Sequence, residues 1–156
     1  MRVTSIVAGL ALVLAACGGE KAGNGAATTT DSAAMSNTAG TATATAGATH
    51  DVDMVMEGTQ PKFVPASVTV KAGDVIRFHN KSGAPHNVNF WPDSIPSNAA
   101  SAISITPNTS ALDSEMIMEQ DGVITVTLNN SAPAGTYKFY CMPHLAMGMK
   151  GQLTIQ

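Results

Sequence analysis

Residues 141–149 bring three kinds of metal-binding side chain into one short stretch. The sequence there is Cys-Met-Pro-His-Leu-Ala-Met-Gly-Met, which places a thiol, an imidazole and a thioether in the spacing C-x2-H-x4-M. Thiolate and imidazole ligands suit soft or borderline transition metals, and a thioether favours copper. A second imidazole stands upstream at His86, between Pro85 and Asn87. The residue types and their spacing therefore predict a copper site.

The predicted ligands form a trigonal set with a weak axial ligand. His86, Cys141 and His144 make up the trigonal set, and Met149 is the axial ligand. This combination is typical of type 1 (blue) copper sites, which transfer one electron at a time. Met147 is the alternative axial ligand, because it lies only two residues earlier. The x4 spacing and the strand that follows favour Met149, since residues 149, 151, 153 and 155 share one face of a strand.

Two other functions of copper proteins compete with electron transfer. The alternative is an extracytoplasmic copper chaperone or storage protein, because thioethers bind Cu(I). The methionines that could form such a loading surface are Met54, Met56, Met116 and Met118. Methionine also commonly fills hydrophobic cores, which is the simpler interpretation of these four. An enzyme is not expected, because four protein ligands leave no open coordination position and the chain has no His-x-His pair.

The N-terminal segment predicts export from the cytoplasm. Residues 1–16 contain Arg2 and an apolar core that is too short to span a membrane, as in a cleaved signal peptide. Leu14-Ala15-Ala16-Cys17 resembles a bacterial lipobox, in which Cys17 would carry the lipid. We therefore expect a protein anchored to a bacterial membrane, on its periplasmic side or at the cell surface. Cys141 would then be the only free thiol of the mature protein, which fits a metal ligand in an oxidising compartment.

Composition divides the rest of the chain at about residue 50. Residues 17–50 are mostly Ala, Thr, Gly and Ser, and they predict a flexible linker with an end-to-end distance of about 30 Å. His50, at the end of this linker, is expected to be an incidental solvated residue. Residues 51–156 are long enough for one folded domain, which we expect to be a monomer. The net charge of −3 argues against nucleic acid as a partner.

The folded part is predicted to be all-β. Short β-branched or aromatic runs alternate with turn signals such as Lys71-Ala72-Gly73-Asp74, a pattern typical of a sandwich or barrel. Prolines break the segment 92–121 into loops, and residues 111–118 within it could be a helical turn or a strand. The expected strands are 52–57, 67–70, 74–80, 86–90, 123–128, 136–141 and 150–155.

Three segments of the domain resemble the plastocyanin-type cupredoxins: 63–74, 84–88 and 135–149. This resemblance implies a cupredoxin-like Greek-key β-sandwich of about eight strands. It implies one copper ion, cycling between Cu(I) and Cu(II), that is held by the four ligands predicted above. It also implies that Asn87 steadies the ligand loop and the thiolate.

Two surface features are candidates for docking a redox donor and acceptor. His144 stands on the ligand loop, so we expect its outer ring edge to lie near solvent. An apolar collar around that edge would either dock a redox protein or only keep water from the metal; it comprises Pro85, Pro143, Leu145, Ala146 and Met147. The second feature is an acidic cluster, for which a solvated loop is the simpler interpretation; it comprises Asp113, Glu115, Glu119 and Asp121.

Overall fold

Alternating apolar side chains build the strands of residues 47–156, the part of the chain that the computed structural model describes. In β7 (Val123–Leu128), Ile124, Val126 and Leu128 are buried while the side chains between them are more exposed. β4 (Val75–Asn80) follows the same two-residue period. This period is the one expected for strands that cover a core with one face.

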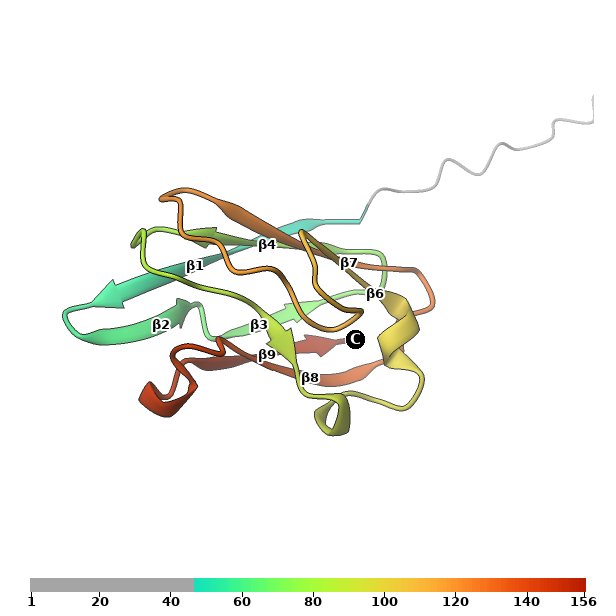
Figure 1. Ribbon diagram of the computed structural model, residues 1–156. Helices are drawn as coiled ribbons and strands as arrows, with labels where there is room; N and C mark the ends of the chain where they lie inside the picture. The colour runs from blue at the N-terminus through green and yellow to red at the C-terminus, as the bar shows by residue number, and fades with distance from the viewer. Residues whose placement is uncertain (1–46) are drawn as a thin grey trace, which may run out of the picture. The chain divides into compact units, whose positions relative to one another are not determined.

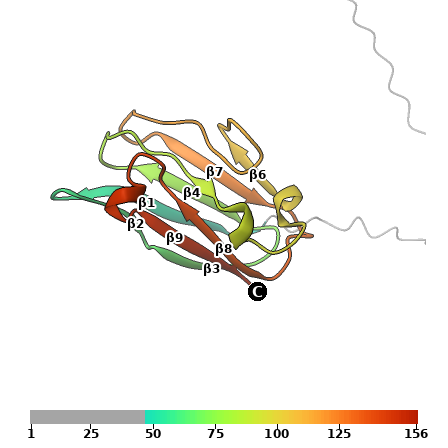
Figure 2. The same cartoon turned by 60° about the horizontal axis from the view of Figure 1, so that its bottom comes forward.

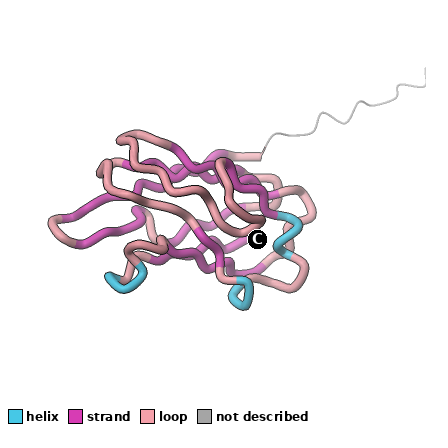
Figure 3. Tube along the Cα trace, in the orientation of Figure 1, coloured by secondary structure: helices cyan, strands magenta, loops and turns pink. Residues whose placement is uncertain are grey.

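Within the described residues nine strands form two sheets (Figure 1). The first sheet has the order β2-β1-β4-β7-β6, with β1 at Thr49–Glu57, β2 at Gln60–Val64 and β6 at Ile103–Thr106. The second has the order β3-β9-β8-β5, with β3 at Ser67–Val70, β5 at Asn89–Phe90, β8 at Gly135–Tyr140 and β9 at Lys150–Ile155. β1 pairs with β4, and β3 with β9, in parallel; the other neighbours are antiparallel. Short 3-10 turns lie in the connections (Figure 3): η1 (Pro92–Ser94), η2 (Ala99–Ala102) and η3 (Leu145–Met147).

Aromatic rings from both sheets meet in the core. Phe78 of the first sheet and Phe139 of the second lie 5.2 Å apart between ring centroids. Phe63 packs edge-on against both rings, at 5.8 and 4.9 Å. Figure 2 turns the second sheet toward the viewer, with the first sheet behind it. Because two sheets share one core through their inner faces, the predicted all-β sandwich is confirmed.

The start of the domain and His86 lie at opposite ends of the sandwich. β1 runs parallel to β4, so Thr49 lies beside Val75 and Met54 lies beside Asn80. The chain leads from Asn80 to His86 in six residues, which places His86 at the far end of β4. Figure 1 shows this separation, with β1 beginning on the right and η3, in dark red, on the left.

The first residues of the domain are tied down by a buried carboxylate. β1 begins at Thr49, and the Nε2 atom of His50 lies 2.8 Å from the Oδ2 atom of Asp74. The composition suggested that His50 is an incidental solvated residue, and this prediction is wrong, because its side chain contacts Asp74. Asp74 also accepts hydrogen bonds from the backbone N–H groups of Ala48 (2.8 Å) and Lys71 (2.9 Å). Burial alone would raise the pKa of Asp74, but these hydrogen bonds outweigh it and lower the pKa.

Seven strands were expected individually from the sequence, and the structure adds two, β2 and β6, which makes nine strands in the described residues. β2 and β6 lie at the two edges of the first sheet. β2 contains Pro61, which weakens a strand signal in the sequence but is tolerated at an edge. β6 has only four residues, ends next to Pro107, and was hidden in the proline-broken segment.

The expected strand at 86–90 is mostly an extended loop. Only Asn89–Phe90 form a strand, and residues 111–118, which form neither a helix nor a named strand, run alongside. Isolated antiparallel bridges join His86 to Ile117 and Asn89 to Asp113. Asn87 and Asn89 are buried as well as His86, so neither face of residues 86–90 is open to solvent.

Several predictions concern residues outside the described range. The predicted signal peptide (1–16), the lipidation site Cys17 and most of the linker lie there. Within residues 47–156, no helix is long and apolar enough to cross a membrane.

Candidate metal centre

Three predicted ligands converge at one end of the sandwich. One potential ligand atom from each of His86, Cys141 and His144 lies within 4.8 Å of the other two. His86 precedes β5, Cys141 follows β8, and His144 lies just before η3. In residues 47–156 no other group of three or more His, Cys, Asp or Glu side chains is this close. His86 and Cys141, which are 55 positions apart in the sequence, thus meet at the point where β8 ends.

Both imidazole rings turn the same nitrogen toward the sulfur. The Sγ atom of Cys141 lies 3.5 Å from Nδ1 of His86 and 3.4 Å from Nδ1 of His144. His86 and Cys141 are fully buried, while His144 is partly exposed. The arrangement is therefore a closed site with one imidazole near the surface. A thiol and two imidazole nitrogens that face one another are a donor set for copper or zinc.

The two imidazoles already have the protonation state that a metal ligand needs, whereas the thiol does not. Burial, followed by the neighbouring His144, lowers the pKa of His86 to about 4, and burial also lowers the pKa of His144. Both imidazoles are therefore neutral at neutral pH, as a ligand must be. Burial raises the pKa of Cys141, against hydrogen bonds from the backbone N–H groups of Asn87 and His144. A metal ion that binds here must displace the thiol proton.

A hydrogen-bond network determines which ring nitrogen of His86 carries no proton. The sequence did not predict this network. Nε2 of His86 lies 2.9 Å from Oγ of Ser82. The Ser82 hydroxyl donates to Oδ1 of Asn80 at 3.1 Å, so its oxygen accepts from Nε2–H of His86. Nδ1 of His86 is then unprotonated and points toward the sulfur. Such partners orient metal-binding histidines generally.

The ligand loop is held by its own backbone and by Asn87. The N–H of Cys141 donates to the carbonyl of Met149 at 3.1 Å, and the N–H of Met149 donates to the carbonyl of His144 at 3.2 Å. Oδ1 of Asn87 accepts from the N–H of Met142 at 2.7 Å, so the steadying role implied by the family resemblance is borne out. Met149 is buried, whereas Met147 is 44% exposed. The burial favours Met149 as the axial ligand.

The sequence of the domain decides the family. The model of the copper binding proteins of the plastocyanin/azurin family matches residues 50–156. The chain belongs to this family. It is therefore a plastocyanin-like cupredoxin, and copper is its cofactor.

Plastocyanins are among the relatives of this cupredoxin. The plastocyanin of Vicia faba is 42% identical over 93 residues, which cover 60% of this chain and 86% of that protein. The plastocyanin of Sambucus nigra is 39% identical with the same coverage of both chains. Among solved structures, the oxidised plastocyanin of Dryopteris crassirhizoma is 32% identical and superposes with a TM-score of 0.53 over 68% of this chain and 99% of that one.

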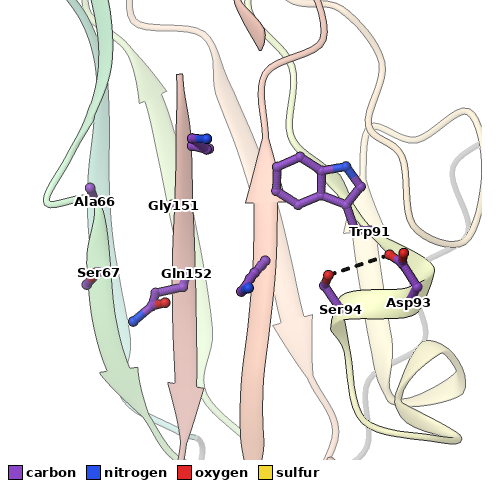
Figure 4. A pocket seen from close by; sticks show the side chains of 9 residues that line it. Ala66, Ser67, Trp91, Asp93, Ser94, Gly151 and Gln152 are labelled. Atoms are coloured by element: carbon purple, nitrogen blue, oxygen red, sulfur yellow. Dashed lines mark hydrogen bonds between the residues drawn. The ribbon is translucent and has the colours of Figure 1, made fainter. Parts of the chain in front are cut away.

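The surface of this cupredoxin carries a broad cleft away from the ligand cluster. The cleft, of about 520 Å³, lies on the outer face of β3, β9 and β8. Figure 4 shows Trp91, Asp93 and Ser94 on one side of it, and Ser67 and Gln152 on the other. The Trp91 ring stacks on Tyr140, with ring centroids 4.4 Å apart. None of the four predicted ligands lines this cleft, so it is not the candidate metal centre.

Three of the four methionines of the suggested loading surface are not core filler. Met54 is fully buried, so it fills the hydrophobic core, which was the simpler interpretation of these methionines. Met56, Met116 and Met118 are exposed instead. At the metal end, Met142, Leu145 and Met147 are exposed too, so an apolar surface does surround the half-buried His144.

Proposed function

We propose that this cupredoxin is a type 1 copper protein that carries one electron at a time between redox partners outside the cytoplasm. Its copper ligands are His86, Cys141, His144 and Met149. The observation that carries the proposal is the convergence of two imidazole Nδ1 atoms on one buried thiol, beside a buried methionine. Copper in such a set supplies a one-electron couple.

The protein's contribution is a ligand geometry that is fixed before any electron moves. The Ser82 hydroxyl holds His86, and Asn87 holds the start of the ligand loop. Backbone hydrogen bonds join Cys141, His144 and Met149 to one another. A site held in this way does not need to rearrange when its charge changes, which suits electron transfer.

An enzyme is the less favoured reading of this site. His86, Cys141 and Met149 are buried, and together with His144 they would fill the coordination positions of the metal. A catalytic metal site keeps an open position for substrate or water. A chaperone or storage protein is the second candidate, favoured by the exposed Met116 and Met118.

The half-buried His144 is the proposed point of electron entry or exit. Redox partners would dock on the apolar surface around it, which includes Leu145 (38% exposed) and Met147 (44% exposed). Exposed apolar patches commonly mark interaction sites. Transient redox encounters bury little area, so they do not need an extensive apolar patch.

The proposed location is a bacterial membrane, on its periplasmic side or at the cell surface, where the monomeric domain is anchored through lipid on Cys17. Within the domain, β1 begins at the end opposite His86, so the start of the domain is not part of the proposed docking surface. Cys17→Ser should move the protein from the membrane fraction to the soluble fraction; continued membrane association would exclude the lipid anchor.

The visible spectrum of the copper-loaded protein tests the proposed function. We expect one equivalent of Cu(II), an intense thiolate-to-copper band, and bleaching of this band on reduction. Cys141→Ser should abolish the band. The control Met147→Leu keeps Cys141 and should stay blue. A colourless copper complex of the unmutated protein would rule out a type 1 site. Rapid loss of copper to a moderate chelator would favour the chaperone or storage protein.

A further inference from the structure

A second cleft lies directly beside the candidate metal centre. Its volume is about 420 Å³, and its walls include Asn87, Asn89, Asp113, Met116 and Met142. Two of these residues belong to segments that hold the proposed ligands. Met142 follows Cys141, and Met116 precedes Ile117, whose backbone exchanges two hydrogen bonds with His86. The cleft is therefore formed between the ligand loop and the segment 111–118, which pairs with residues 86–90.

The cleft exposes two thioethers. Met142 is 59% exposed and Met116 is 38% exposed. They come from segments about 25 residues apart, yet they line the same cleft. An exposed methionine gains little from the hydrophobic effect, since its side chain stays in water. Its sulfur is a soft, polarisable ligand that selects Cu(I) over harder ions.

A buried oxygen in the same wall has no partner. Asn89 is only 3% exposed, and its Oδ1 atom accepts no hydrogen bond within the described residues. Asn89 lies opposite Asp113 in an isolated bridge, and both residues line the cleft. Buried polar atoms are nearly always paired, because an unpaired one costs free energy. This oxygen belongs to the same cleft wall as the two thioethers, and an amide oxygen is an acceptor that a cation can satisfy.

We propose that this cleft is a second, surface-exposed copper site that binds Cu(I) through the thioethers of Met116 and Met142. The Asn89 oxygen and the Asp113 carboxylate supply negative potential at the same place. Because the thioethers provide most of the affinity, the site should discriminate against Zn²⁺. Its place next to Cys141 suits it to receive Cu(I) that later enters the buried centre. Only this loading role rests on the proposed function; binding in the cleft does not.

Nuclear magnetic resonance of methionine methyl groups tests the binding. The sample is the full protein, copper-loaded and reduced, with 13C-labelled methionine methyls, and Cu(I) is added under anaerobic conditions. We expect the methyl signals of Met116 and Met142 to shift together and to saturate at one added equivalent. The signals of buried Met54 and of Met149 should not move. Zn²⁺ should produce no such shift.

Exposure provides the internal control for adventitious binding. Met118 is 61% exposed, which is more than Met116, but it does not line the cleft. If shifts follow exposure, so that Met118 responds as strongly as Met116, Cu(I) is binding to single thioethers and the proposal is wrong. An absence of shifts at tenfold excess, or equal shifts with Zn²⁺, would also overturn it.

Substitutions separate a two-sulfur site from independent contacts. Met116→Leu and Met142→Leu should each lower the affinity for the added Cu(I) at least tenfold, and the double variant should be little worse than either single one. The matched controls Met118→Leu and Met56→Leu should leave the affinity unchanged. Additive, small losses in the two single variants would contradict a shared site.

The loading role has its own readout. Metal-free protein receives Cu(I) from a chelator complex, and the blue colour is measured after oxidation at successive times. Met142→Leu should slow uptake several-fold and leave the final spectrum unchanged, whereas Met118→Leu should not. Unchanged uptake would remove the loading role. If the unmutated protein never becomes blue, the proposed function is wrong. The methyl shifts then still show whether the cleft binds Cu(I).

Discussion

Ser82→Ala tests whether a single hydroxyl positions His86. The Ser82 oxygen lies 2.9 Å from Nε2 of His86, 3.1 Å from Oδ1 of Asn80 and 3.1 Å from the N–H of Ala84. Removal of the hydroxyl leaves Asn80 with two backbone donors, from Ser82 and Gly83. Ala84 is half-buried, so water can replace its lost partner. His86 is fully buried, so its Nε2–H remains unpaired.

The expected destabilisation follows from that one buried donor. An unsatisfied buried donor costs about 1–3 kcal/mol. For a domain of this size the melting temperature changes by about 4 °C per kcal/mol, so Ser82→Ala should lower it by about 4–12 °C. The lost partner should also let the imidazole proton move between the two nitrogens.

Two measurements on the metal-free protein check this prediction. Urea denaturation gives the loss of stability, and 15N chemical shifts of the His86 ring report which nitrogen carries the proton. Ser82→Thr keeps the hydroxyl and should restore both values toward those of the unmutated protein. If Ser82→Ala changes the stability by less than about 0.5 kcal/mol, which is the range of ordinary surface substitutions, and the ring shifts do not move, the reasoning is refuted.

Three further predictions concern the axial ligand, the docking surface and the start of β1. Met149→Leu should keep the blue colour and raise the reduction potential measured by voltammetry, because a thioether stabilises the oxidised ion; Met147→Leu should change the potential little. Leu145→Glu should slow electron transfer to a redox partner in stopped-flow experiments, with spectrum and potential unchanged, because it places a charge in an apolar docking surface. Asp74→Asn should destabilise the protein at neutral pH but not in acid. The pKa of Asp74 is lowered in the folded state, so its carboxylate contributes stability above its ordinary pKa. This contribution is lost as the pH falls through the folded-state pKa.

Each of these predictions has a contrary outcome. A potential that responds to Met147→Leu and not to Met149→Leu would reverse the axial assignment. A Leu145→Glu variant with a shifted spectrum but an unchanged rate would show that the apolar surface only excludes water. A stability difference between Asp74→Asn and the unmutated protein that persists after Asp74 is protonated in the folded state would mean that Asp74 acts through packing rather than through its charge.

The sequence predicted the convergence of His86, Cys141 and His144, and part of this cluster is local. Cys141, His144 and Met149 lie within nine residues, so one loop brings them together whatever the rest of the chain does. The alternation of Tyr137, Phe139 and Cys141 also correctly predicted that the thiol lies on the buried face. Both signals depend on neighbours in sequence, which are the contacts that spacing and period can report.

Contacts between distant segments were not predictable from such patterns. The pairing of His50 with Asp74 joins residues 24 positions apart, and no spacing rule distinguishes that histidine from a solvated one. The Ser82 hydroxyl lies only four residues from His86, but its contact depends on the conformation of the intervening turn, where Gly83 has a φ of 68°. Edge strands such as β2 bury fewer side chains and therefore leave a weaker alternation in the sequence.

The burial of His86 shows how a correct prediction can rest on the wrong cause. Strand parity placed His86, Val88 and Phe90 on one buried face, and all three are buried. The same argument places Asn87 and Asn89 on an exposed face, yet they are buried as well. These asparagines meet segments that are distant in the sequence: Asn87 accepts a hydrogen bond from the N–H of Met142 in the ligand loop, and Asn89 lies opposite Asp113 in an isolated bridge. Contacts with distant segments, which leave no periodic pattern in the sequence, therefore exclude solvent from both faces of residues 86–90. Because His86 is fully buried, its imidazole needs a fixed hydrogen-bond partner, and Ser82 supplies it.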